Sequence, residues 1–554
     1  MFNLLVNKPV LPIEFGTRSR GAGVLSSLRH LVYSNRLYTY TLQGPVPTRL
    51  FGTPPELILG DAAAGQSILS GNLLYGGQRW PFTDLAELSE KANQHWRAHV
   101  HGFDWLCDLR AVGSDSSREL ARKYISQWIG TYTNWSPLAW KSDVLGQRLS
   151  NWLTHYGFFA SSGSQNFTEL FFKEVAQQAR HLNRVVMSTT EGPARVRGLK
   201  GLIYCGVALP EREKYFHRGL GYLEAELNDQ IFLDGGHCSR NPQVHAEVLA
   251  DIISIRDTFV SAHIDVPDWL LGVVKRMVPM LRAFRHADGG LALFNGSANG
   301  DPSFIDMLLS KSKVKTRAIS SAPHTGFHRL YAGRTTIIMD TGEPPNQTAN
   351  NWGHAGTLAF EMSAEKDRII VNCGMSRTST LDWRQALRST AAHSTIVVDD
   401  VNSSEINSAG GYSRKLGQVI SSRREIDGSV IIEASYDGYY KLFGLIHRRL
   451  IMLSPDGAEF QGEDTLIGSG GHSYNLCFHL HPSVQATILR NKSSALIKPQ
   501  RGSGWRFTCL DRSVALEESV YFDSDNVRRR SQQIVVFGPL NGAGASVKWR
   551  FCRI

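Results

Sequence analysis

The stretch that decides the fold is NNWGHAGTLAFEMSAEKDRIIVNCGMSRTSTLDWRQALRSTAAHSTIVVDD, residues 351–400. Apolar and polar residues alternate in its first half, and two short apolar runs bounded by Gly or charged residues follow, which predicts three β-strands. His354 precedes the first strand, Asn372 ends the second and His393 precedes the third. Because the ends of neighbouring strands converge, we expect the two imidazoles and the amide to share one pocket.

Length and composition set the outer limits. A chain of 554 residues exceeds what one hydrophobic core usually supports, so two or three domains are expected. The 42% apolar and 20% charged residues are typical of a soluble globular protein. No run approaches the roughly 20 apolar residues that span a bilayer, and the first thirty residues lack the apolar core of an ordinary signal peptide. The 7 cysteines are scattered without CxxC spacing, which argues against a disulfide framework or a cysteine-based zinc module.

The chain is basic, with a formal net charge of +10 and a sequence pI near 9.2. This charge favours association with a polyanion, and nucleic acid, anionic lipid and acidic polysaccharide all satisfy it, as does a basic surface without a specific purpose. No Gly-rich phosphate loop follows a strand, so nucleotide binding is not indicated. The sequence leaves the oligomeric state open.

Four segments differ in pattern. Residues 1–80 hold turns and short apolar runs, which favours an N-terminal arm or cap. Through 81–297 the apolar residues recur at spacings of three and four, which predicts helices with one buried face each. A basic, weakly patterned linker at 298–320 precedes 321–554, where short strands and frequent Gly or Ser turns predict a sandwich of antiparallel sheets.

Several spaced motifs carry a family resemblance. They are GHAG (353–356), VNCG (371–374), Trp383-Arg384, RSTAAHST (388–395), HRRLIML (447–453) and CFHLHP (477–482). Together they resemble the C-terminal domain of the heparinase II/III family of polysaccharide lyases. The resemblance covers most of the chain and implies an incomplete α/α toroid followed by an antiparallel β-sandwich. It also implies β-elimination on an acidic polysaccharide in the cell envelope or periplasm, with the cytoplasm as the alternative since no ordinary signal peptide is seen.

The sequence departs from the family pattern around its histidines. Trp352 stands at the first His of a His-x-His-x-Asp run, and Gly356 at its Asp. The resemblance maps a structural zinc onto His354, Asn372 and His393, although no cofactor is required for the chemistry. Asn372 stands where Asp is expected, and an amide is a poor zinc ligand.

A second polar segment, DGGHCSRNPQVH at 234–245, resembles the Asp-Gly-Gly loop of the same family. Its candidate residues are His237, Arg240, Asn241 and His245. We expect this loop to form a substrate groove at the rim of the helical ring, or else a helix-capping turn. The family's loop commonly carries a Tyr that falls here on Val244.

β-Elimination of a uronic acid needs a partner for the carboxylate, a base for the C5 proton and an acid for the leaving oxygen. Arg240, Arg195 or Asn241 can hold the carboxylate. His237, His245 or His354 can move protons, because histidine titrates near neutral pH. Arg384 and Arg388 can bind sulfate or carboxylate groups bidentately.

Two alternatives remain open at this point. The chain can be a glycan-binding protein that kept the fold and lost the chemistry. It can also be a toroid glycoside hydrolase that uses Asp104 and Asp234 as acid and base.

Overall fold

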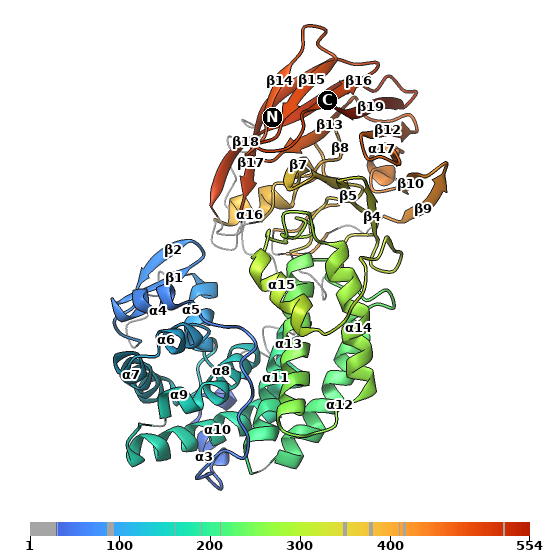
Figure 1. Cartoon of the computed structure of the whole chain (residues 1–554). Helices are drawn as coiled ribbons and strands as arrows, with labels where there is room; N and C mark the ends of the chain where they lie inside the picture. The colour runs from blue at the N-terminus through green and yellow to red at the C-terminus, as the bar shows by residue number, and fades with distance from the viewer. Residues whose placement is uncertain are drawn as a thin grey trace. The chain divides into compact units, whose positions relative to one another are not determined.

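The computed structural model describes residues 29 and 31–554, apart from 86–92, 161, 190, 211, 347–351, 376–379, 409, 414–416 and 524–526. Contacts divide the chain into two compact units. The helical unit comprises the described part of Leu11–Gln230 together with Glu247–Val274, and the β-rich unit comprises Ile231–Ala246 together with Lys275–Ile554. Figure 1 labels most of the elements of both units.

The helical unit consists of helices with one small hairpin. Its elements are α3 (Arg36–Thr41), α4 (Ala62–Leu69), β1 (Asn72–Tyr75), β2 (Gln78–Pro81), α5 (Gln94–Gly102), α6 (Leu106–Val112), α7 (Asp115–Tyr132), α8 (Ser142–Thr154), α9 (Tyr156–Ala160), α10 (Gln165–Thr189), α11 (Pro193–Ala208) and α12 (Arg212–Gln230). Two longer helices, α13 (Pro242–Ser261) and α14 (Asp268–Ala283), belong to it in part.

Local sequence explains where these helices begin and how closely they pack. The Asn93 side chain accepts from the Trp96 amide at the start of α5, and Ser114 does the same for Ser117 at the start of α7. Where α8 meets α11, a Cβ on Gly146 would lie 2.6 Å from the Gly198 Cα, so the two backbones touch. Closely packed helices of this kind confirm the helical domain that the sequence predicts.

The β-rich unit holds two large antiparallel sheets. One runs β14 (Gln485–Ile488), β15 (Ser494–Lys498), β16 (Trp505–Cys509), β19 (Ala545–Arg553), β12 (Glu459–Ile467), β11 (Ile446–Leu453), β10 (Ser429–Tyr436), β9 (Val419–Ile426). The other runs β17 (Val514–Phe522), β18 (Arg528–Pro539), β13 (Ser473–Leu480), β7 (Asp367–Val371), β6 (Phe360–Ala364), β5 (Thr335–Asp340), β4 (Phe327–Ala332), β3 (Ser321–Ala322), with β8 (Ile396–Val398) beside β13. Short helices α15 (Pro302–Lys311), α16 (Leu381–Arg388), the 3₁₀ turn η1 (Thr390–Ala392) and α17 (Tyr440–Phe443) complete it.

A large apolar core lies between the two sheets and takes residues from both. Strands β10, β11 and β12 alternate buried and half-buried residues along their length, as sheets with one inward face do. Phe360 of one sheet stacks on Trp549 of the other, with ring centroids 5.6 Å apart. The predicted antiparallel β-sandwich is therefore confirmed.

The three strands expected between 351 and 400 are β6, β7 and β8. Every residue of β6 is buried, because its second face is also covered. On that face Glu361 lies 3.0 Å from His286 Nε2 and accepts the Leu293 amide. Strand β8 pairs with Tyr474–Leu476 of β13 and β7 pairs with His479–Leu480 of the same strand, which brings the segment before β8 next to the end of β7.

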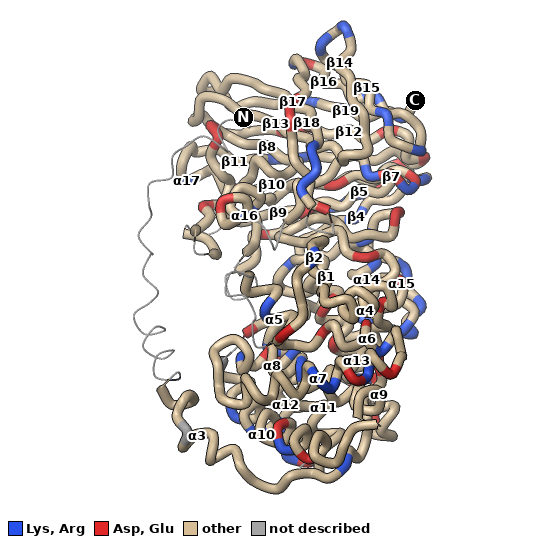
Figure 2. Tube along the Cα trace, turned by 90° about the vertical axis from the view of Figure 1, so that its left-hand side faces the viewer, with Lys and Arg blue, Asp and Glu red and all other residues tan. Residues whose placement is uncertain are grey.

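The distribution of charge and hydropathy does not by itself point to a functional site. Lys and Arg are spread over the described part of the trace with Asp and Glu among them, and in this view they form no single stripe (Figure 2). Among the described residues, no helix combines the length and apolar character that crossing a bilayer demands.

Candidate functional site

Two loops of the β-rich unit are tied together by asparagines. Asn295 Nδ2 donates to the Arg240 carbonyl at 3.2 Å, and Asn241 Nδ2 donates to the Asn295 carbonyl at 3.0 Å. Asn241 Oδ1 also accepts the Val244 amide at 3.0 Å, which caps α13. Arg240 and Asn295 both have left-handed backbones, with φ of 54° and 51°. Backbone strain of this kind is kept where the surroundings fix it, often at functional sites.

His354 and His393 form a buried hydrogen-bonded pair. His354 Nδ1 lies 3.0 Å from His393 Nε2, and the two rings meet edge to face. The His354 backbone amide points to Asn295 Oδ1 at 3.4 Å, which joins the pair to the asparagine loops. The two imidazoles expected to share a pocket are therefore in contact.

The contacts of the pair determine which ring nitrogen of each histidine carries a proton. His393 Nδ1 lies 2.7 Å from the Ser389 carbonyl, which only accepts, so Nδ1 carries the proton. The ring is buried, which disfavours a second proton, so at neutral pH it is uncharged and its Nε2 is an acceptor. His354 Nδ1–H then donates to it, and His354 Nε2 keeps a free lone pair. Burial, with His393 and Arg388 nearby, also holds the pKa of His354 well below its usual value.

Gly296 lies beside that lone pair, where it places no side chain of its own. A Cβ at this position would lie 3.5 Å from His354 Nε2, 3.6 Å from Asn241 Nδ2 and 2.8 Å from Met375 Sδ. Gly296 has φ of 84°, which disfavours any other residue. Among the described residues His354 Nε2 has no hydrogen-bond partner. A base and an amide donor thus flank one point.

Arg240 is not available for a substrate carboxylate, contrary to the sequence-based expectation. Its guanidinium pairs with buried Asp340 and donates to the carbonyls of Thr325, Gly326 and Glu343. Burial raises the pKa of Asp340, with Arg240 opposing that shift. The arginine therefore holds the loops of the site in place and does not face a ligand.

Arg388 is also a structural brace. It is fully buried and donates to the carbonyls of Gly353, Asn407 and Gly411. Arg384 differs, because its guanidinium lies over the Trp352 ring, 5.3 Å from the centroid, and the residue as a whole is partly exposed. Within the described part of the chain its Nε has no hydrogen-bond partner. Of the two predicted anion-binding arginines, only Arg384 keeps that role open.

The two loop histidines are held by local contacts. His237 Nδ1 accepts the Ser239 amide at 3.0 Å, and burial lowers its pKa to about 3. His245 Nε2 donates to the Met277 carbonyl at 3.0 Å, and its ring meets Phe284 edge to face. Both imidazoles lie in packed surroundings, and His245 belongs to the core rather than to a substrate groove.

Asn372 does not offer a zinc ligand. Its Oδ1 accepts the Ser394 amide at 3.1 Å and its Nδ2 donates to the Leu293 carbonyl at 3.2 Å, so both ends of the amide are used. No group of three His, Cys, Asp or Glu suited to a metal occurs among the described residues. The set of His354, Asn372 and His393 therefore does not fit the zinc that the family resemblance implies.

The carboxylates of the hydrolase alternative are likewise engaged. Asp234 accepts the amides of His324 and Thr325 and the Thr325 hydroxyl, which fastens its loop to the start of the β-rich segment. Asp104, in the helical unit, is bound by Asn151 and His99.

Arg195, also in the helical unit, forms a 2.8 Å ion pair with Glu226. The sequence-based assignment of Arg195 to a substrate carboxylate stays a prediction.

Three residues of the site escaped the sequence analysis. Asn295 and Gly296 form an Asn-Gly turn, a signal that marks a tight left-handed turn but not its partners. Tyr412 follows two glycines and donates from its hydroxyl to the His354 carbonyl at 3.2 Å. Burial raises the Tyr412 pKa, so the phenol stays protonated.

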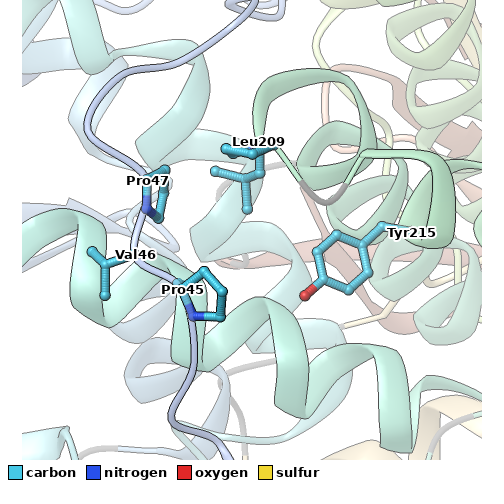
Figure 3. A pocket seen from close by; sticks show the side chains of 7 residues that line it. Pro45, Val46, Pro47, Leu209 and Tyr215 are labelled. Carbon is cyan, nitrogen blue, oxygen red and sulfur yellow. The ribbon is translucent and has the colours of Figure 1, made fainter.

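The helical unit holds a small apolar pocket (Figure 3). It is lined by Pro45, Val46, Pro47, Ala176, Leu209, Pro210 and Tyr215. None of the candidate site residues lies in it.

Solved structures share this fold. They include a heparinase III at TM-score 0.72 and 14% identity, covering 97% of this chain and 92% of that one. A heparan sulfate lyase from Pedobacter heparinus matches at TM-score 0.61 and 15% identity, covering 97% and 91%. A chondroitin AC lyase from Streptomyces coelicolor matches at 0.56 and 9%, covering 94% and 80%. The fold is thus that of the lyases which join an α/α toroid to a β-sandwich.

Family models make the assignment specific. The model described as "Heparinase II/III N-terminus" matches residues 78–316, and "Heparinase II/III-like, C-terminal" matches residues 314–550. The chain belongs to the heparinase II/III-like family.

Two curated relatives carry different descriptions. The FtsZ-localized protein C of Caulobacter vibrioides is 29% identical over 583 residues, covering 98% of this chain and 99% of the relative. The heparin-sulfate lyase of Bacteroides thetaiotaomicron is 24% identical over 194 residues, covering 32% of this chain and 26% of the relative.

Proposed function

We propose that this chain is a polysaccharide lyase that cleaves a uronic-acid-containing polysaccharide by β-elimination, with His354 as the base. The observation that carries the proposal is the arrangement around Gly296, where a neutral imidazole nitrogen with a free lone pair and an amide donor flank the same point. Family membership and the fold of the lyases support the same reaction class. The cell envelope or periplasm is the compartment that we propose for it.

The Asn241 amide is assigned to the carboxylate of the sugar. One of its N–H groups donates to Asn295, and the second is the donor that neutralises the negative charge next to C5. Hydrogen bonds to a developing anion in a buried site are stronger than in water. The C5 proton becomes more acidic as a result.

His354 Nε2 then takes the C5 proton. The electrons of the C5–H bond form the C4–C5 double bond while the C4–O bond breaks. When C5–H and C4–O lie on the same side of the ring, the imidazolium returns its proton to the leaving oxygen, so one residue serves as base and acid. His354 is 2% exposed, so binding must displace a covering side chain, for which the flexible Met375 is suited.

Arg384 and Trp352 are assigned to a neighbouring part of the substrate. A guanidinium over an indole ring offers a cation for a carboxylate or sulfate and an aromatic face beside it. Of the two arginines predicted from the sequence to bind sulfate or carboxylate groups, this proposal retains Arg384 in that role.

The experiment is ultraviolet detection of the new C4–C5 double bond with heparan-type, chondroitin-type, alginate and bacterial acidic polysaccharides. We expect a rise with at least one of them, lost in His354→Asn. Gly296→Ala should also abolish it by filling the space beside His354 Nε2. The matched control is Gly542→Ala, since Gly542 has φ of 78° but nothing within 4 Å of an added Cβ. Intact substrate throughout the panel refutes the proposal.

A second candidate function comes from one comparison. The match to an FtsZ-localized protein spans nearly the full length of both chains, which favours a protein that kept the fold for localisation or glycan binding. Fluorescence imaging of the tagged chain beside FtsZ tests this candidate. Under it, His354→Asn leaves the position in the cell unchanged, and the polysaccharide panel shows binding without cleavage.

A further inference from the structure

The turn before β8 holds the carbonyl that orders the protons of the histidine pair. His479 Nε2 donates to the Ala391 carbonyl at 3.0 Å, and its Nδ1 lies 2.8 Å from the Ser519 hydroxyl. Asn402 Oδ1 accepts the Thr390 amide at 2.8 Å. The Ser389 carbonyl therefore belongs to a turn that is fixed from two sides.

A metal is not needed to orient the pair. A metal-bound histidine usually has its second ring nitrogen fixed by a carbonyl or carboxylate, and here Ser389 occupies that position for His393. The nitrogen that would face the metal instead accepts the His354 Nδ1 proton at 3.0 Å. The third predicted ligand, Asn372, uses its amide to join Leu293 to Ser394.

We infer that His393 is a positioning residue that takes the place of a structural metal. Its Nδ1–H donates to the Ser389 carbonyl, and its Nε2 accepts the Nδ1–H of His354. These two hydrogen bonds lock His354 in the tautomer whose Nε2 is free. This inference rests on the proposed function only for its effect on elimination. The lock itself is a property of the free protein.

The lock has a direct chemical consequence. A neutral imidazole has one acceptor nitrogen, and only the Nδ1–H tautomer points that acceptor at the space beside Gly296. When His354 takes a proton on Nε2, its Nδ1–H still donates to His393, so the same contact also stabilises the imidazolium.

The test is long-range nitrogen–proton NMR on protein labelled with ¹⁵N-histidine at neutral pH, with the His354 signals assigned by their loss in His354→Asn. We expect a protonated Nδ1 and an unprotonated Nε2 in the unsubstituted protein. His393→Phe removes the acceptor and should release the other tautomer. His393→Gln offers a side-chain oxygen to Nδ1–H and should keep the original one. His328→Phe, at a buried histidine elsewhere in the β-rich unit, is the control and should leave the His354 signals unchanged.

Activity and metal content complete the test. Because a base in the wrong tautomer loses much of its rate, we expect His393→Phe to lower kcat about 10- to 100-fold, with recovery in His393→Gln. Stoichiometric zinc in the purified protein, an Nε2–H tautomer, or an unchanged tautomer in His393→Phe each overturns the inference. If the tautomer is as stated and no polysaccharide is cleaved, the proposed elimination fails while the lock stands.

Discussion

Replacing Asn372 by aspartate exchanges one NH₂ group for an oxygen at a site with no solvent exposure. The substitution keeps the acceptor for the Ser394 amide but turns the donor facing Leu293 into a carboxylate oxygen opposite a carbonyl oxygen. A buried carbonyl left without its donor costs about 1–3 kcal/mol. The buried negative charge adds to that cost.

The pH dependence follows from the same geometry. A buried carboxyl has its pKa raised above the unfolded value of about 3.9, so the folded state binds the proton more tightly. The stability of Asn372→Asp relative to the unsubstituted protein therefore increases as pH falls, and is lowest at pH 8. Once protonated, the carboxyl donates to Leu293 as the amide did.

Urea unfolding at pH 5, 6, 7 and 8 measures this difference. The control is Asn541→Asp, which adds the same charge at an exposed position and should change stability by less than about 0.5 kcal/mol. An Asn372→Asp protein that is as stable as the unsubstituted one at pH 8, or that loses further stability toward pH 5, would refute the assigned role of the amide.

Three further predictions concern the stability contributed by Arg240 and His245 and the substrate affinity contributed by Arg384. Arg240→Met should cost about 3–5 kcal/mol because it leaves Asp340 buried without a partner, and Arg240→Met/Asp340→Leu should recover most of that loss in urea unfolding. Burial lowers the pKa of His245 to about 4 against an unfolded value near 6.5, so its contribution is complete above pH 6.5 and decreases by about 2 kcal/mol between pH 7 and pH 5. His245→Leu should therefore show a flatter decline of stability with acid, and an unchanged slope would contradict the assignment. Arg384→Ala should raise KM for a sulfated substrate with little change in kcat, whereas an equal loss of kcat would place Arg384 at the reacting bond.

Period and spacing in the sequence were enough to predict the helical half, the sandwich and the meeting of His354 with His393. Strand alternation is local, so residues 351–400 specified their own strands. The roles of Arg240 and Arg388 were beyond reach, because the carbonyls that bind them come from loops distant in the chain and leave no side-chain pattern. The same holds for Asn295, whose partners Arg240, Asn241 and His354 all lie more than fifty positions away in the chain. The sequence also gives no indication of which ring nitrogens of His354 and His393 carry protons, because one backbone carbonyl oxygen decides this.

The hydrogen bonds of Arg388 affect how the sequence of this fold can change. Its guanidinium donates to main-chain oxygens, which every amino acid supplies, so the residues at those positions can be exchanged while these hydrogen bonds remain. Selection can then alter what the loops present to a ligand while the framework around His354 persists. A scaffold fastened in this way can change the side chains of its loops while its main-chain framework stays intact.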